Sequence, residues 1–335
     1  MISSRVLGSL RNEFRRSLMA KLGVVLILLV VLTAIFAPFL ATQGPKEQNL
    51  GESNLPPVGF SQSTEEIQFV DGERQTVTVT EKGSLAHPLG TNQLGQDIYS
   101  RILYGARTSL LVGLFGTAIA AVTGVSVGLI AGYYSGRVDD ALMRFADIML
   151  AFPALVLAIA LIGLLGPRAI SFPDPFVAAG LVSDMPDEIT VPITVTLVIA
   201  LVNWVWFARV ARGEALSVRE KNYVKASRSL GASDRRLMLK HVLPNSMTPI
   251  IVLATVQIAV IIILESALSF LGFSGTTLSW GFDINQGRDL LRTSWWISTV
   301  PGMAIVITVI GINLVGDWLR DALDPDIEGE SGGGL

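Results

Sequence analysis

Residue types that perform covalent chemistry are few in this sequence, and their spacing forms no reactive group. Asp139 and Asp140 are adjacent acids, but they lie in a short polar turn with no histidine nearby. There is no cysteine, and the two histidines, His87 and His241, are too far apart in sequence to indicate a metal site. Gly-Lys and His-Glu-x-x-His sequences are both absent. We therefore expect no enzyme activity from this chain, and no cofactor or metal bound to it.

A further acid, Glu265, lies within the apolar run Leu-Glu-Ser-Ala-Leu-Ser-Phe-Leu-Gly. A carboxylate inside a membrane span is costly and by default indicates a polar interior or a translocation path. Glu265 also lies near the outer end of its run, which fits a hydrogen-bonded acid at the membrane interface equally well. Glu265 is therefore a candidate polar residue of a translocation path, with the interfacial alternative left open.

The composition defines the class of protein that positions these residues. Half of the 335 residues are hydrophobic, 16% are charged, and the mean hydropathy is +0.55. Several apolar runs reach about 20 residues, the length that crosses a bilayer as a helix. We predict an all-α polytopic membrane protein with six transmembrane helices, the third of them ending near Leu165 and kinked at Phe152-Pro153.

Polar stretches between the apolar runs set the expected boundaries. These are a cytoplasmic N-terminal segment 1–21, a first transmembrane helix 22–41, an extracytoplasmic insertion 42–106, a five-helix core 107–318 that includes a cytoplasmic loop 212–247, and a cytoplasmic tail 319–335. Within the insertion, 67–80 alternates around Asp71-Gly72, the pattern of a small β-hairpin. The stretch before residue 107 is amphipathic and predicts an interfacial helix.

The distribution of basic residues predicts the orientation. Of the 25 Lys and Arg residues, 17 fall in segments placed inside and 8 in segments placed outside. Because cytoplasmic loops carry an excess of Lys and Arg, both termini are expected on the cytoplasmic side. The insertion and its hairpin are then extracytoplasmic.

Small residues recur at every fourth position of the second apolar run, which predicts close packing against another helix. Glycine this frequent lowers helix propensity, so a compensating contact is expected. The stripe consists of Gly116, Ala120, Gly124, Gly128 and Gly132.

A polar, basic island runs from Tyr223 to Asn245 between two apolar runs. Gly231 suits the left-handed position that ends a helix. Ser233 or Asp234 can cap a second short helix, which Pro244 is expected to close. The island therefore predicts a helix, a glycine turn and a helix between two membrane spans.

The spacing of this island resembles the "EAA" loop of binding-protein-dependent ABC importer permeases. Lys225-Ala226-Ser227, Gly231 and Leu243-Pro244 occupy the places of its motif, with Lys225 and Ser227 departing from the usual acid and alanine. The segment 87–110, with Asn92 and Gln96 as departures, and the ending Asp-Trp-Leu-Arg-Asp-Ala-Leu-Asp-Pro at 317–325 are similar to permeases of the dipeptide/oligopeptide importer family.

The resemblance implies a permease subunit in the cytoplasmic membrane, similar to the C-type member of a heterodimeric pair. Its expected partners are a paralogous permease subunit, two cytoplasmic ATPase subunits that bind ATP, an extracytoplasmic substrate-binding protein and the lipid bilayer, with no nucleic acid. In such permeases the loop docks into a cleft of the ATPase. The docking residues it implies are Tyr223, Ala226, Gly231, Ala232, Ser233, Asp234 and Leu243.

The alternative function is an ion-coupled secondary carrier that works without an ATPase. Such carriers usually show intramembrane acids or broken helices near the middle of the membrane. Only Glu265 fits that description here, and a carrier leaves the island unexplained. Within the importer class the substrate stays open among dipeptides, longer peptides, nickel and sugars.

Overall fold

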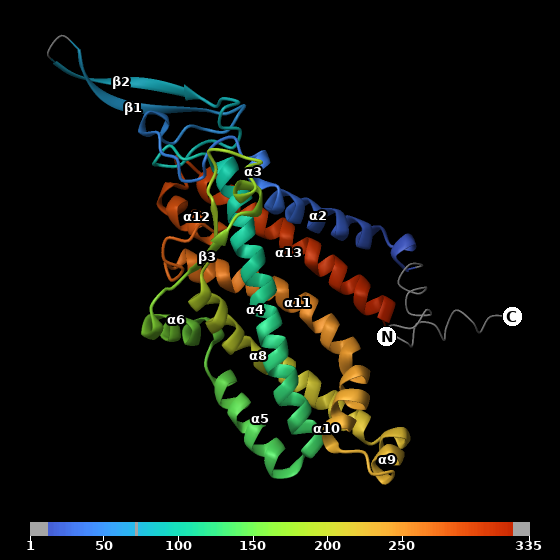
Figure 1. Ribbon diagram of the computed structural model, residues 1–335. Helices are drawn as coiled ribbons and strands as arrows, with labels where there is room; N and C mark the ends of the chain where they lie inside the picture. The colour runs from blue at the N-terminus through green and yellow to red at the C-terminus, as the bar shows by residue number, and fades with distance from the viewer. Residues whose placement is uncertain (1–12, 71–72, 324–335) are drawn as a thin grey trace.

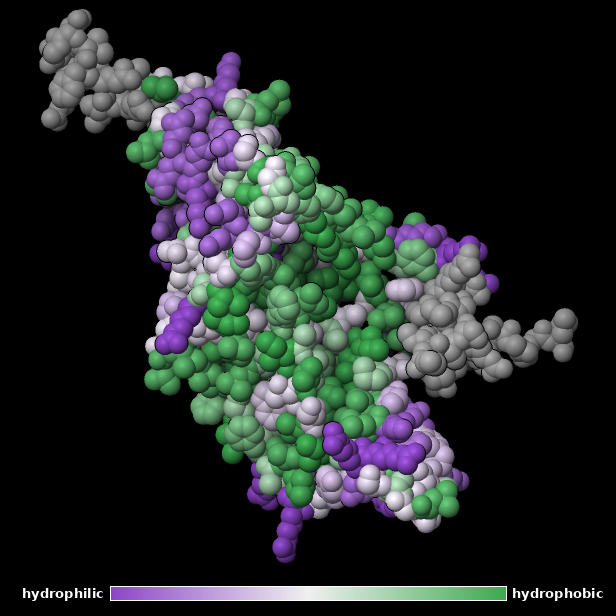
Figure 2. Space-filling model, viewed as in Figure 1, coloured by the Kyte–Doolittle hydropathy of each residue, from purple (hydrophilic) through white to green (hydrophobic). Residues whose placement is uncertain are grey.

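The computed structural model describes residues 13–70 and 73–323. Long apolar helices dominate it, and Figure 2 shows their apolar side chains as a broad band between two polar ends. Five helical segments of the described chain are long and apolar enough to cross a membrane. They are α2 (Leu18–Ile35), α4 (Ile98–Tyr134), α8 (Ile193–Arg219), the segment Asp234–Phe270 that contains α11 (Leu243–Phe270), and α13 (Trp296–Leu323).

The sixth predicted span is a broken pair of helices. α5 (Gly136–Ala151) and α6 (Ala154–Leu165) meet at an angle of 90°. Phe152 between them is extended, with φ −94° and ψ 137°. Because the proline ring disfavours helical geometry in the residue before it, Pro153 forces this conformation on Phe152. The sequence predicted a kink here, and the structure shows a complete break.

Figure 1 shows a β-hairpin at one end of the molecule. β1 (Ser61–Val70) and β2 (Glu73–Lys82) pair antiparallel, with Ser61 opposite Lys82 and Val70 opposite Glu73. The predicted hairpin is confirmed and is longer than its alternating core, while its turn at 71–72 lies outside the described residues. We call this the hairpin end, and the opposite end, which carries α9 (Asn222–Ser229) and α10 (Asp234–Leu237), the loop end.

Short elements complete the hairpin end. They are α3 (Ala37–Leu40), η1 (Leu50–Glu52), α7 (Pro175–Ala178), α12 (Trp280–Gly287), η3 (Arg288–Leu290), and the two-stranded sheet of β3 (Ile170–Pro173) and β4 (Glu188–Val191). The interfacial helix predicted before residue 107 is not a separate element. Asp97 caps α4 by accepting a hydrogen bond from the Ser100 backbone N–H at 2.8 Å, and the helix continues unbroken to Tyr134.

The residues of the 87–110 stretch fasten α4 to α12 at the hairpin end. Arg101 forms a buried ion pair with Asp283 and donates to the Gln96 side-chain oxygen at 2.6 Å. Asn92 donates to the same Gln96 oxygen at 2.9 Å. The two residues that depart from the family pattern, Asn92 and Gln96, therefore bond to each other, and the stretch is structural.

The glycine stripe of α4 lies against α8 at its loop-end half. A Cβ added to Gly124, Gly128 or Gly132 would overlap the backbone carbonyls of Trp204, Ala208 and Arg212 respectively. The three carbonyls are themselves four residues apart, so the two backbones run closely together over two turns. Ala120 is fully buried, whereas Gly116 approaches α11 instead, where an added Cβ would lie 3.1 Å from Ile261.

The prediction that Pro244 closes a short helix is wrong. α10 continues through a π-helical turn, η2 (Met238–Val242), directly into α11, and Pro244 lies in the first turn of α11. A proline inside an α-helix removes one N–H bond and crowds the carbonyl four residues earlier. The wider turn immediately before Pro244 is the kind of local adjustment that accommodates such an insertion. α10, η2 and α11 therefore form one continuous helical segment from the loop into the membrane.

Candidate functional site: the loop between α8 and α11

The turn at Gly231 is built as the sequence predicts. Gly231 has φ +85°, a conformation that glycine adopts without steric cost. Its N–H bonds the Arg228 carbonyl at 3.0 Å, and the Ala232 N–H bonds the Ser227 carbonyl at 3.2 Å. These paired bonds are those of a glycine-terminated helix end. Nothing lies within 4 Å of an added Cβ, so glycine is needed here for its conformation and not for space.

An apolar cluster holds the loop against the membrane helices. Val224 from α9, Leu237 from α10 and Val242 from η2 are all buried. They pack with residues at the loop end of α4 and α8, namely Leu129, Tyr133, Ala215 and Val218. The loop is therefore a packed extension of these two helices.

Polar contacts tie the same elements together. The Tyr133 hydroxyl of α4 donates to the Asp234 carboxylate at 2.6 Å, and the Arg228 guanidinium of α9 lies 5.3 Å from the centre of the Tyr133 ring. Arg219, at the end of α8, donates to the carbonyls of Gly132 at 3.1 Å and Tyr133 at 3.0 Å. Because Asp234 accepts a hydrogen bond from Tyr133, it anchors the loop to α4 within this chain.

Lys225 has a local partner that explains its charge. Its ammonium lies 2.9 Å from a carboxylate oxygen of Glu220, in the turn between α8 and α9. The hydrogen bond and charge of Lys225 lower the pKa of Glu220. At the position where the family motif has an acid, this chain thus has the basic member of an exposed ion pair.

The outward face of α9 carries two exposed residues of the predicted docking set, Tyr223 and Ala226, and Leu230 follows at the end of the helix. Tyr223 is 43% exposed, Ala226 is exposed, and Leu230 is 89% exposed. Residues three and seven positions apart lie on one helix face, so these three side chains form one outward apolar surface. Gly231 and Ser233 are also exposed, while Ala232 and Leu243 are half-buried.

Leu230 is an exposed apolar residue of this surface that the sequence argument did not name. It lies seven positions after Tyr223, and that helical spacing could have indicated it. Ser233 occupies the N-cap position of α10, although its side chain makes no capping hydrogen bond.

Glu265 lies far from this loop, packed between α4 and α11. It is fully buried, and its carboxylate accepts hydrogen bonds from Ser109 of α4 at 3.0 Å and from Ser269 at 2.6 Å. Among the described residues it forms no ion pair with a basic side chain. This geometry favours a hydrogen-bonded acid that joins two helices over a residue facing an open path.

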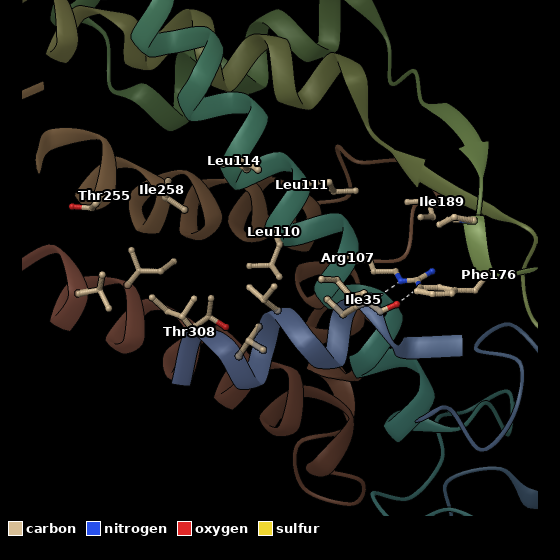
Figure 3. A pocket seen from close by; sticks show the side chains of 17 residues that line it. Ile35, Arg107, Leu110, Leu111, Leu114, Phe176, Ile189, Thr255, Ile258 and Thr308 are labelled. Carbon is tan, nitrogen blue, oxygen red and sulfur yellow. Dashed lines mark hydrogen bonds between the residues drawn. The ribbon is translucent and has the colours of Figure 1, made fainter. Parts of the chain in front are cut away.

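A cavity of about 610 Å³ lies between α2, α4, α11 and α13 (Figure 3), and Glu265 is not among its lining residues. Its polar side chains are already paired. Arg107 forms an ion pair with Asp174 and donates to the carbonyls of Ala34 at 2.6 Å and Ile35 at 2.9 Å. The hydroxyls of Thr255 and Thr308 bond carbonyls of their own helices. The cavity thus offers apolar contact and no free charge.

The fold and the loop together define a multi-pass membrane protein with a packed helical loop at one end. A family model described as "Binding-protein-dependent transport system inner membrane component" matches residues 124–329, and the chain belongs to this family. A second model, "N-terminal TM domain of oligopeptide transport permease C", matches residues 8–57.

Curated relatives share about a third of their residues with this chain. The di/tripeptide transport system permease protein DppC of Pseudomonas aeruginosa (strain UCBPP-PA14) is 36% identical over 91% of this chain and 88% of its own length. The probable D,D-dipeptide transport system permease protein DdpC of Escherichia coli (strain K12) is 35% identical over 91% and 87%. The glutathione transport system permease protein GsiD of Pectobacterium atrosepticum is 36% identical over 75% and 76%.

A solved structure shows the same fold. It is an inward-facing conformation of the MetNI methionine ABC transporter, with a TM-score of 0.50, 15% identity, and coverage of 67% of this chain and 96% of the matched one. The chain is therefore a multi-pass permease subunit of an ABC importer in the cytoplasmic membrane, and the ATPase is a separate partner subunit. The same findings favour the importer over the ion-coupled carrier.

Proposed function

We propose that this chain is the C-type permease subunit of an importer for dipeptides or oligopeptides. The names of its relatives support a peptide substrate. In this proposal the chain pairs with a paralogous permease subunit and two ATPase subunits that bind ATP. A binding protein delivers the peptide at the hairpin end, which faces outward, and the loop end and both termini are cytoplasmic.

The observation that carries the coupling mechanism is the attachment of the loop to three membrane helices. α9 and α10 pack on the ends of α4 and α8, and α10 continues through η2 into α11. A partner that moves α9 therefore moves the ends of all three helices with it. ATP-driven closure of the ATPases would in this way change the helix arrangement from outward-open to inward-open.

The peptide path in this proposal lies between two permease subunits. A peptide carries charged ends, and burying an unpaired charge is costly. The cavity inside this chain presents apolar side chains, and its one arginine is already paired with Asp174. This supports a path that a second subunit completes.

The substitution Ala226→Trp tests the docking surface. Ala226 is exposed, so the larger side chain meets only water in the undocked chain. In a fitted contact, overpacking typically costs about 1–3 kcal/mol, and about 1.4 kcal/mol is a tenfold loss of association. We expect normal membrane insertion, weaker co-purification of the ATPase subunit, and lower peptide uptake per ATP hydrolysed.

Lys225→Arg is the matched control, because arginine keeps the positive charge beside Glu220. It should leave ATPase binding and uptake near wild type. Normal uptake by Ala226→Trp with the ATPase still bound would place the docking surface elsewhere. Uptake that persists with no ATPase present would refute the importer function itself.

A further inference from the structure

The break between α5 and α6, here called the elbow (residues 151–154), leaves backbone hydrogen-bond donors free. Among the described residues, no acceptor pairs with the N–H groups of Phe152, Ala154, Leu155 or Val156. No side chain caps the start of α6. The elbow residues themselves are exposed. In water such free donors would cost nothing, so their depth in the membrane decides what must cover them.

Neighbouring contacts place the elbow near the middle of the membrane. Before it, Ala146 of α5 belongs to an apolar cluster with Trp204 and Ala208 of α8, and after it, Ala158 of α6 belongs to a cluster whose α8 members run from Val195 to Val202. The elbow is therefore level with residue 203 of α8, ten residues from the hairpin end of that helix. Ten residues span about 15 Å, which is half of a hydrocarbon core about 30 Å thick. In Figure 1, α6 correspondingly crosses the direction of α4 at mid-height of the molecule.

Lipid cannot cover this elbow favourably. Unpaired backbone groups cost several kcal/mol each in hydrocarbon, so irregular backbone at this depth occurs only against protein or a water-filled cavity. The side chains around the free N–H groups are apolar: Phe152 is 55% exposed, Val156 is 57% exposed, and Leu164 at the far end of α6 is 82% exposed. Apolar side chains beside free donors fit a protein surface better than water.

The depth of the elbow also limits which partner subunit can cover it. In the proposed complex, the ATPase subunits and the binding protein act at the two faces of the membrane, so the second permease subunit is the partner at mid-membrane depth. We propose that the elbow and the exposed face of α6 contact the second permease subunit, which covers the apolar side chains and supplies at least one hydrogen-bond acceptor to the free N–H groups. This rests on the proposed function, because it requires an importer with two permease subunits.

Photo-crosslinking in the complete complex tests this assignment. Benzoylphenylalanine replaces Phe152 in one version and Leu164 in another, with Val306 of α13, which is 55% exposed, as the matched control. The first position is a conservative replacement, and the second keeps the test valid should a change at the elbow impair folding. Illumination should give an adduct with the mass of the second permease subunit at Phe152 and Leu164, several-fold above the control position.

Two outcomes would overturn the assignment. Lipid adducts alone at both positions, in a complex that contains two permease subunits and takes up peptide, would refute the elbow contact and leave the proposed function intact. Equal subunit adducts at Val306 would show that the contact is not specific to this face. A purified, active complex with one permease subunit would instead refute the two-subunit function on which the assignment rests.

Discussion

At the residue scale, a hydrogen bond between two residues 101 positions apart in sequence links the loop to the membrane helices. The Tyr133 hydroxyl bonds the Asp234 carboxylate, and the Tyr133 ring also supports Arg228. The contact joins α4 to both helices of the loop. Removing the hydroxyl of Tyr133 therefore removes this hydrogen bond and leaves the apolar packing of the loop in place.

The substitution Tyr133→Phe should weaken coupling without unfolding the chain. It removes the donor to Asp234 and keeps the ring under Arg228, and a hydrogen bond to a charged group contributes about 1.5–3 kcal/mol net. Asp234 is exposed, so water can replace the lost partner. We expect wild-type yield and a lower ratio of peptide uptake to ATP hydrolysis in reconstituted complexes.

Tyr134→Phe is the control at the adjacent position, since Tyr134 is 49% exposed and contacts Tyr133 only edge-on, with ring centres 5.3 Å apart. It should retain wild-type coupling. An unchanged uptake-to-hydrolysis ratio for Tyr133→Phe would mean that the hydroxyl takes no part in transmission.

Sequence reasoning predicted the glycine turn and the helix before it because local spacing determines them. The positive φ of Gly231 and the helical spacing of Tyr223 and Ala226 follow from neighbours within a few positions. The partners of Asp234 and Lys225 could not be found in this way. Tyr133 reaches Asp234 only after α4 and α8 have packed, and the Glu220–Lys225 pair depends on the turn before α9.

At the element scale, the length of the apolar runs predicted the membrane helices, and proline gave two of the errors. Pro244 was expected to end a helix, yet it is accommodated inside a continuous one after a π turn. Pro153 was expected to bend a helix, yet it separates two. The same residue type has both effects because the outcome depends on whether neighbouring elements compensate for its missing N–H, which local sequence does not reveal.

The α4–α8 contact gives a prediction at this scale. Gly128→Ala places a methyl group against the Ala208 carbonyl, and the two backbones must move apart. Overpacking of this kind costs typically about 1–3 kcal/mol, so we expect lower yield and a lower unfolding temperature of the purified subunit or complex. Gly128→Leu should be more damaging.

Gly213→Ala on α8 is the matched control, because nothing lies within 4 Å of its added Cβ. Alanine favours a helix over glycine by about 1 kcal/mol, so this change should be neutral or stabilising. If Gly128→Ala were as stable as Gly213→Ala, the close approach of α4 and α8 would not contribute to stability.

At the scale of the whole molecule, composition and hydropathy predicted the class, and the local motifs predicted the family. They could not predict how the helices pack, the elbow near mid-membrane, or the cavity between α2, α4, α11 and α13. Each of these depends on contacts between residues distant in sequence. The orientation in the membrane rests on the distribution of Lys and Arg, and it gives the last prediction.

The hairpin end should face outward and the loop end should face the cytoplasm. Because the sequence has no cysteine, the single substitutions Ser84→Cys and Ser233→Cys each introduce one reactive group, and both positions are exposed. Ser84 follows β2 at the hairpin end, and Ser233 lies at the start of α10 with no capping hydrogen bond from its side chain to lose. In intact cells a membrane-impermeant thiol reagent should label Ser84→Cys and leave Ser233→Cys unmodified, and opening the membrane should make both reactive. The reverse pattern in intact cells would invert the topology, and the loop between α8 and α11 could then not meet a cytoplasmic ATPase.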